Sequence, residues 1–161
     1  MGNNVWIFEN CRIEGVDNYE GDFFSPVITF GDGITVQQNL HLTCANNITI
    51  GRNTAIAANV TITDIHHPYD DIVIPIEKQK LKVAPVTIGE DCKIYNNAVI
   101  LQGVTIGKHV TVAANSVVTK DIPDYCVVAG APAKIVKQYN FEEKGWINHR
   151  NSLIINKLPP P

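Results

Sequence analysis

The first candidates for chemistry are two adjacent histidines, His66 and His67, which a proline follows directly. An imidazole has an ordinary pKa near neutrality, so it can accept and return a proton at physiological pH. Neighbouring residues of a strand point to opposite sides, so only one of the two can face a groove. Counting along the repeat places His66 inward and His67 outward. His67 is therefore the candidate general base, with Asp64 as a group that could orient its ring, although a plain surface histidine is commoner.

The element that must position His67 is a six-residue repeat. An aliphatic residue begins each repeat, and a mostly small or β-branched residue follows four places later. The aliphatics of the clearest stretch are Ile88, Ile94, Ile100, Ile106, Val112 and Val118. A fixed period of six is neither helical nor a simple alternation, and it is typical of a solenoid. The pattern predicts an all-β, parallel β-helix in which three short strands make one triangular turn around a shared apolar interior.

Breaks in the repeat divide the chain. We expect a single domain over residues 1–161, with an irregular first coil at 1–29 that a polar stretch interrupts. Regular coils follow at 30–123. Within them the rhythm stops at Pro68 and resumes in phase at Ile88, which predicts an excursion loop at 68–87. Long loops at the corners of a solenoid usually serve binding.

Residues 124–161 should form a C-terminal cap and tail. Two apolar runs at 126–130 and 135–136 predict closing strands. Residues 141–153 could form a short helix whose apolar side holds Phe141, Trp146 and Ile147. Such a cap would cover the last strand edge, which otherwise invites aggregation.

Composition and charge limit the classes of function to consider. The net charge of -3 gives no reason to expect nucleic-acid binding, and no apolar run is long enough to span a membrane. The four cysteines are Cys11, Cys44, Cys92 and Cys126; they form no CxxC pair and are expected to be reduced. We therefore expect a cytoplasmic protein with no membrane insertion.

The motifs together resemble a known family. The chain is similar to the hexapeptide-repeat acetyltransferases, which fold as a left-handed parallel β-helix. It resembles the maltose and galactoside O-acetyltransferases, and more closely the bacterial O-antigen and capsule polysaccharide O-acetyltransferases. The resemblance runs from about Phe30 to Trp146, and its most specific parts are the run Asp64-Ile65-His66-His67-Pro68-Tyr69, the run 115–123 and the run 130–136.

The resemblance implies acetyl transfer from acetyl-CoA to a sugar hydroxyl, in grooves between the subunits of a homotrimer, without a metal. The family's histidine before proline matches His67. By family position, the backbone N–H of Asn96 would meet the developing oxyanion, and Ala114 and Thr119 would flank the pantetheine arm.

The same resemblance implies further binding residues. Lys120 and Lys134 match basic positions that contact the phosphates of coenzyme A. His41 matches a histidine of the polysaccharide-modifying relatives and is a candidate contact for the saccharide acceptor, although such an outward residue is more often plain surface. Many relatives have tryptophan and glycine where this chain has Lys93 and Tyr95. This difference changes the side chains that would lie beside the thioester, and with them the size of the acceptor that fits.

Three alternatives stay open. An amino sugar, including a nucleotide-linked one, could replace the hydroxyl acceptor, which would make the protein an N-acetyltransferase. A zinc hydratase similar to the γ-type carbonic anhydrases needs three converging histidines, and the opposed directions of His66 and His67 disfavour it. A noncatalytic β-helix that only assembles or scaffolds is the third.

Overall fold

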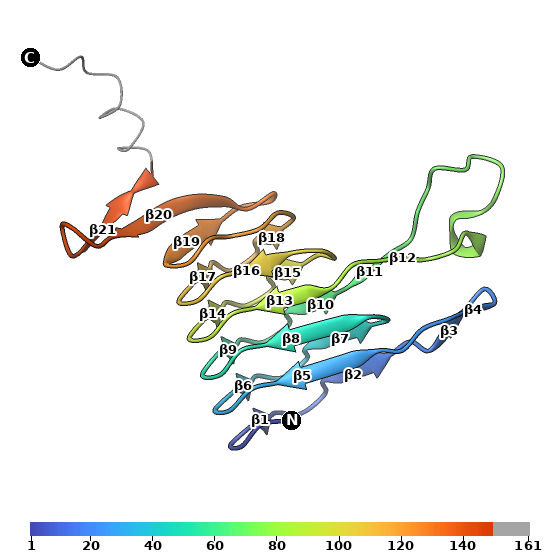
Figure 1. The fold of residues 1–161 in the computed structure, drawn as a ribbon, viewed down its shortest axis with the longest axis horizontal. Helices are drawn as coiled ribbons and strands as arrows, with labels where there is room; N and C mark the ends of the chain where they lie inside the picture. Colours follow the sequence, from blue (N-terminus) through green and yellow to red (C-terminus); the bar gives the residue numbers. More distant parts are fainter. Residues whose placement is uncertain (150–161) are drawn as a thin grey trace, which may run out of the picture.

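Three parallel sheets form the sides of a triangular prism, and the chain winds around it in left-handed coils (Figure 1). The structure is a computed structural model that describes residues 1–149. Each coil contributes one short strand to each face in turn. The prediction of an all-β, left-handed parallel β-helix is confirmed.

We number the faces in the order in which the chain meets them. Face 1 contains β1 (Trp6–Ile7), β6 (Thr35–Val36), β9 (Ala55–Ile56), β14 (Lys93–Ile94), β17 (Thr111–Val112), β19 (Cys126–Ala129), β20 (Lys134–Asn140) and β21 (Gly145–Asn148). Face 2 contains β2 (Arg12–Gly15), β7 (His41–Cys44), β10 (Thr61–Thr63), β15 (Val99–Ile100) and β18 (Val117–Val118). Face 3 contains β5 (Val27–Phe30), β8 (Asn47–Ile50), β13 (Val86–Ile88) and β16 (Thr105–Ile106).

The aliphatics of the repeat fill the interior of the prism. The six that define the repeat, from Ile88 to Val118, are each 0% exposed. The residues four places later, such as Cys92, Ala98 and Ser116, are also buried. Full burial of one such aliphatic contributes about 1.5–3 kcal/mol. The repeat therefore encodes the core, as predicted.

The corners between the faces need residues that tolerate a positive φ. At the edge between faces 1 and 2, asparagines take this place with φ near 60°: Asn10, Asn39, Asn59, Asn97 and Asn115. Asparagine adopts the left-handed region more readily than most residues. The side chains also bond along the edge, from Asn39 Nδ2 to Asn59 Oδ1 at 2.9 Å and from Asn97 Nδ2 to Asn115 Oδ1 at 3.0 Å.

The excursion leaves the prism earlier than predicted. Face 2 ends in this coil at Thr63, and Asp64 is the last residue that points into the interior. β11 (Ile65–His66) then pairs antiparallel with β12 (Lys82–Val83), and the two strands form the stem of the loop. A 3-10 helix, η1 (Ile76–Lys78), lies beyond the stem.

This early departure changes the position of His66. The prediction that His66 points into the core is wrong, because the strand has already left the prism. His66 is half-buried on the stem, and its ring contacts the ring of Tyr69 edge-on at 5.8 Å.

A second hairpin projects beside the excursion. It consists of β3 (Asn18–Tyr19) and β4 (Asp22–Phe23), within the polar stretch that interrupts the first coil. Ion pairs join the two projections, from Lys78 to Glu20 at 2.9 Å and from Lys80 to Asp22 at 2.6 Å. The first coil therefore braces a loop that lies 58 residues later in the chain.

The C-terminal part closes with strands rather than a helix. The predicted strands at 126–130 and 135–136 are confirmed as β19 and β20, and β21 pairs with β20. The helix predicted at 141–153 is wrong for its first eight residues, which form a turn and β21. Phe141 and Trp146 pack against tyrosines of β20 and of the preceding corner. Residues 150–161, and with them the rest of that helix and the tail, lie outside the described residues.

In the described part of the chain, no helix has both the length and the apolar character needed to cross a membrane.

Candidate active site

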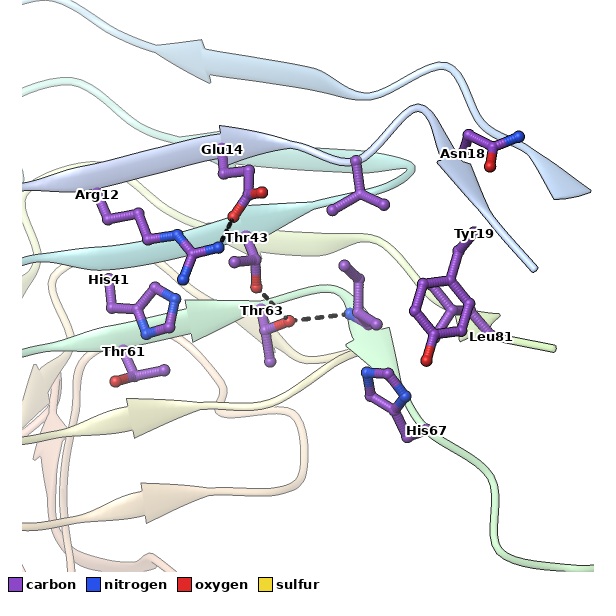
Figure 2. A pocket seen from close by; sticks show the side chains of 12 residues that line it. Arg12, Glu14, Asn18, Tyr19, His41, Thr43, Thr61, Thr63, His67 and Leu81 are labelled. Atoms are coloured by element: carbon purple, nitrogen blue, oxygen red, sulfur yellow. Dashed lines mark hydrogen bonds and ion pairs between the residues drawn. The ribbon is translucent and has the colours of Figure 1, made fainter. Parts of the chain in front are cut away.

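A groove of about 540 Å³ lies over the outer surface of face 2, beside the two projections (Figure 2). Its floor consists of outward side chains of β2, β7 and β10. Its end is formed by Tyr19 from β3 and by His67 and Leu81 from the excursion. We call this the face-2 groove.

His67 lies where the stem of the excursion meets the face-2 groove. Its side chain is 37% exposed, and its ring meets the ring of Tyr19 edge-on at 5.3 Å between centroids. The Nδ1 atom is enclosed and has no hydrogen-bond partner among the described residues. Because the side chain is partly exposed and lines the groove, the other ring nitrogen, Nε2, is the one left for a bound molecule.

The carboxylate of Glu77 lies near the enclosed nitrogen. Its Oε2 atom lies 3.9 Å from His67 Nδ1, which is too far for a hydrogen bond but close enough to attract a positively charged imidazolium. The Tyr19 hydroxyl lies 2.7 Å from the Glu77 carbonyl oxygen and 3.0 Å from its Oε2. Partial burial, followed by the hydrogen bond to Glu77, raises the pKa of the Tyr19 phenol, so the phenol stays protonated and donates. Tyr19 and Glu77 thus pack against the side of the His67 ring that carries Nδ1.

Asp64 does not orient His67, and this prediction is wrong. The Asp64 side chain is 0% exposed. It accepts hydrogen bonds from Ala45 N at 2.7 Å and Asn46 N at 2.8 Å, and it receives the Cys44 thiol at 3.3 Å. Burial, and then the carboxylate of Asp64, raises the pKa of Cys44 to about 12, so the thiol stays a donor. Asp64 therefore fixes the corner of the preceding coil, between β7 and β8.

The floor of the face-2 groove is polar. His41 lies in register between Arg12 and Thr61 on neighbouring strands, and all three line the groove. The hydroxyls of Thr43 and Thr63 bond to each other at 2.9 Å, and Arg12 pairs with Glu14 (Figure 2). His41 and His67, which are distant in the sequence, therefore face the same space.

The residues matched to acetyl-CoA binding lie elsewhere on the prism. Asn96 and Ala114 occupy the edge between faces 1 and 2, in consecutive coils, where Asn115 N donates to Asn96 O at 3.0 Å. Thr119 and Lys120 follow β18 on the edge between faces 2 and 3, the edge from which the excursion also leaves. None of them lines the face-2 groove. One protomer therefore does not bring them together with His67.

Several of these groups lack partners in the described chain. The backbone N–H groups of Asn96 and Ala114 make no hydrogen bond with another described residue, and Ala58 one coil below shares this property. The edge therefore presents a column of free donors. Lys120 and Lys134 are exposed and have no ion pair within residues 1–149.

Lys93 and Tyr95 lie at the end of β14, just before Asn96. Tyr95 is 44% exposed, and the Lys93 ammonium lies 5.3 Å from the centre of its ring. The two side chains thus form an amphipathic wall next to the column of free N–H donors.

No cluster of three or more histidine, cysteine, aspartate or glutamate side chains suited to a metal ion occurs in the described residues. Within one protomer, the three histidines considered for zinc do not converge, since His66 faces Tyr69 on the stem while His41 and His67 face the groove.

Tyr19 and Glu77 are the site residues that sequence reasoning missed. The interruption of the first coil at 15–25 was visible as a break in the repeat, but its position in space was not. Only the fold shows that this hairpin lies beside a loop distant in sequence.

Comparison with known proteins gives a consistent result. Residues 85–120 match the family model described as bacterial transferase hexapeptide (six repeats). A protein of Escherichia coli K12, whose name assigns it to lipopolysaccharide biosynthesis as an O-acetyl transferase, is 36% identical across 86% of this chain and 85% of that protein.

Two solved structures extend the comparison. A hexapeptide-repeat acetyltransferase from Vibrio cholerae has a TM-score of 0.68 and 28% identity, over 87% of this chain and 73% of its own. A galactoside acetyltransferase in complex with coenzyme A has a TM-score of 0.64 and 31% identity, over 89% of this chain and 66% of its own.

Proposed function

The chain belongs to the hexapeptide-repeat acetyltransferases, and we propose that it moves the acetyl group of acetyl-CoA to a hydroxyl of a saccharide, with His67 as the general base. The observation that carries the proposal is the position of His67, which presents Nε2 at the end of a polar groove. The similarity to a protein named for lipopolysaccharide biosynthesis supports a role in making a surface polysaccharide. We infer that this role is cytoplasmic.

The reaction follows from this geometry. A sugar hydroxyl is a weak nucleophile, and His67 Nε2 accepts its proton as the oxygen attacks the thioester carbonyl. The resulting imidazolium gives that proton to the departing thiolate, so the products are the acetyl ester and free coenzyme A. The Glu77 carboxylate lies 3.9 Å from Nδ1, so it can interact with the positive charge that the ring takes up during the reaction. Holding both substrates in one groove supplies much of the remaining acceleration.

The coenzyme needs a second protomer. His67 leaves from one edge of face 2, whereas Asn96 and Ala114 lie on its other edge. In a cyclic homotrimer, these two edges of neighbouring protomers meet, and closure leaves no open contact. The free N–H of Asn96 then meets the oxyanion, and Ala114 and Thr119 let the pantetheine arm lie close to the backbone. Lys120 and Lys134 bind the phosphates as point charges.

The acceptor lies in the face-2 groove. His41 and the threonine hydroxyls of its floor offer donors and acceptors for sugar hydroxyls. Lys93 and Tyr95 of the neighbouring protomer border the thioester and limit which acceptors fit. An aromatic ring and an ammonium at this wall suit a saccharide better than an apolar acceptor.

The test is a screen of sugars and nucleotide sugars with acetyl-CoA, in which release of the free thiol is followed. The central variant is His67→Ala, with His66→Ala as the matched control, because His66 faces Tyr69 outside the groove. We expect kcat to fall by about 100-fold or more for His67→Ala and by a few-fold at most for His66→Ala. Coenzyme A binding, measured by calorimetry, should persist in both.

A mild effect of His67→Ala would favour an amino-sugar acceptor, because an amine can lose its proton to water. No turnover and no binding of coenzyme A by the wild-type chain would support a noncatalytic β-helix and overturn the proposal.

The shared site has its own test. His67→Ala and Ala114→Trp damage opposite halves of one site, so each variant should be inactive alone. Mixed trimers formed by coexpression should regain about a quarter of the sites, because random assembly pairs intact halves at that frequency. A monomer in sedimentation, or no regained activity, would remove the intersubunit site.

A further inference from the structure

The edge between faces 3 and 1 lies on the opposite side of the prism from face 2, and it carries a column of left-handed residues. From the N-terminal coils upward these are Asn4, Gly33, Asn53, Asp91, His109 and Tyr125. The backbone N–H of each upper residue donates to a carbonyl of the coil below, as in His109 N to Glu90 O and Tyr125 N to Lys108 O, both at 2.9 Å.

At its upper end the column changes from small residues to aromatic ones. Glycine, asparagine and aspartate adopt a positive φ readily, and histidine does so less often. Tyr125 has a φ of 56°, which is unusual for so bulky a residue. The upper coils therefore keep two aromatic side chains where the lower coils carry small residues. A backbone outlier of this kind is a reason to look for a function.

Two more rings complete an enclosure. Tyr139 of β20 and Trp146 of β21 join His109 and Tyr125 around a hollow of about 260 Å³. The His109 and Trp146 rings lie 6.5 Å apart and within 22° of parallel. The Tyr139 ring meets Trp146 edge-on at 5.6 Å. Trp146 remains 42% exposed, so the hollow is open to solvent.

Polar groups lie around these rings. The Lys108 ammonium is 5.3 Å from the centre of the Tyr125 ring. The hydroxyl of Tyr139 and the indole N–H of Trp146 make no hydrogen bond with any other residue that the structure describes. The hollow therefore combines aromatic walls with donors and acceptors that a ligand can use.

The size and charge of the hollow restrict the ligand. Its volume lies just below the range of roughly 300–1,000 Å³ that suits drug-sized molecules, so it holds one ring rather than a whole coenzyme A. A cationic guest would compete with the Lys108 ammonium already placed over Tyr125. A pyranose fits best, because its C–H face stacks on aromatic rings while its hydroxyls reach the polar groups.

We propose that this aromatic hollow, formed by His109, Tyr125, Tyr139 and Trp146, is a second saccharide-binding site that holds one sugar residue of a polymeric acceptor away from the face-2 groove. The choice of a saccharide rests on the proposed function. The position on the opposite edge lets a long glycan contact the enzyme at two places, which raises its effective concentration at the groove.

Trp146 can report binding directly, since the chain has only two tryptophans and Trp6 lies on β1 at the other end of the prism. In a Trp6→Phe chain, methyl pyranosides of glucose, galactose and N-acetylglucosamine should change Trp146 fluorescence with half-saturation at about 1–10 mM. AMP serves as the nucleobase probe, because bases also stack on aromatic rings.

The key variant is His109→Asn, which removes the ring and keeps a residue suited to the left-handed corner. It should raise the half-saturation about 3- to 10-fold, the value of one aromatic contact. Transfer of acetyl to a monosaccharide should be unchanged, while KM for a polymeric acceptor should rise. Asp91→Asn, on the same edge one coil below, is the matched control and should change neither.

Three other results have clear meanings. A response to AMP but not to the pyranosides would assign the hollow to a nucleobase and overturn the proposal. No response to any probe would show that the rings only pack β20 and β21 against the prism, and would also overturn it. A pyranoside response that His109→Asn weakens, in a chain without acetyl transfer, would support the hollow while refuting the proposed activity.

Discussion

Asp64 gives the sharpest test of the structure, because the sequence and the fold assign it different roles. If Asp64 oriented His67, Asp64→Asn would lower kcat and leave stability intact. The structure instead buries its carboxylate under two backbone N–H groups and the Cys44 thiol. We therefore expect a loss of stability, with near-normal kcat per folded site.

The magnitude follows from the groups left behind. Ala45 is 1% exposed, so without the carboxylate its N–H loses its partner away from water, whereas Asn46 is exposed and can bond to solvent. Leaving a buried donor unsatisfied costs about 1–3 kcal/mol, and a hydrogen bond to a charged acceptor contributes a similar amount. Asp64→Ala should thus cost about 2–5 kcal/mol. Asp64→Asn should cost less, because one oxygen remains.

Urea unfolding followed by circular dichroism measures this, at one protein concentration because assembly shifts apparent stability. With a slope near 2 kcal/mol/M, the midpoint for Asp64→Ala should fall by about 1–2.5 M. Asp17→Asn is the control, since Asp17 is exposed and its carboxylate has no hydrogen bond within residues 1–149. An unchanged midpoint together with a large fall in kcat would refute the structural role and restore the catalytic one.

Three further predictions follow from contacts described above. Glu77→Gln should lower kcat about 2- to 5-fold, because the exposed carboxylate contributes only a weak ion pair to the imidazolium. Steady-state kinetics measures this, with Tyr69→Phe as a control. An unchanged kcat would show that Glu77 does not assist His67 in turnover. Lys120→Ala with Lys134→Ala should raise KM for acetyl-CoA about tenfold or more at low salt and less at high salt, with kcat nearly constant; an effect on kcat alone would contradict phosphate binding. Burial and Asp64 raise the pKa of the Cys44 thiol from 9.0 to about 12, so the folded chain holds this proton more tightly than the unfolded chain, and stability should fall as the pH rises from 9 towards about 12. Urea midpoints measured across this pH range should fall less steeply in Cys44→Ala than in the wild type. Parallel curves for the two proteins would contradict the raised pKa.

The repeat allowed the core and the prism to be predicted residue by residue, because each interior position recurs at a fixed spacing. The six repeat aliphatics Ile88, Ile94, Ile100, Ile106, Val112 and Val118 are buried as expected. The pattern failed where the chain leaves the prism. At Asp64 the interior position holds a carboxylate whose partners come from the preceding coil, and hydropathy does not show such partners.

The remaining errors share a cause. The apolar residues of 141–148 suited a helix as well as a hairpin, and pairing of β21 with β20 decided the outcome. Tyr19 and Glu77 meet only because two projections of different coils lie side by side. Contacts between irregular segments depend on tertiary structure, so spacing within the sequence could not reveal them.

The uniform winding of the prism also fixes the distance between residues along its axis. Every turn advances the chain by one strand spacing, about 4.8 Å. The axial offset between β10, after which the chain leaves towards His67, and β18, which precedes Lys120, is therefore fixed at two turns. This distance can therefore be lengthened only by whole turns. Duplication of residues 88–105 would add one turn and keep every interior contact. It would also move Lys120 away from the level of His67, so that a cofactor of constant length could no longer reach both.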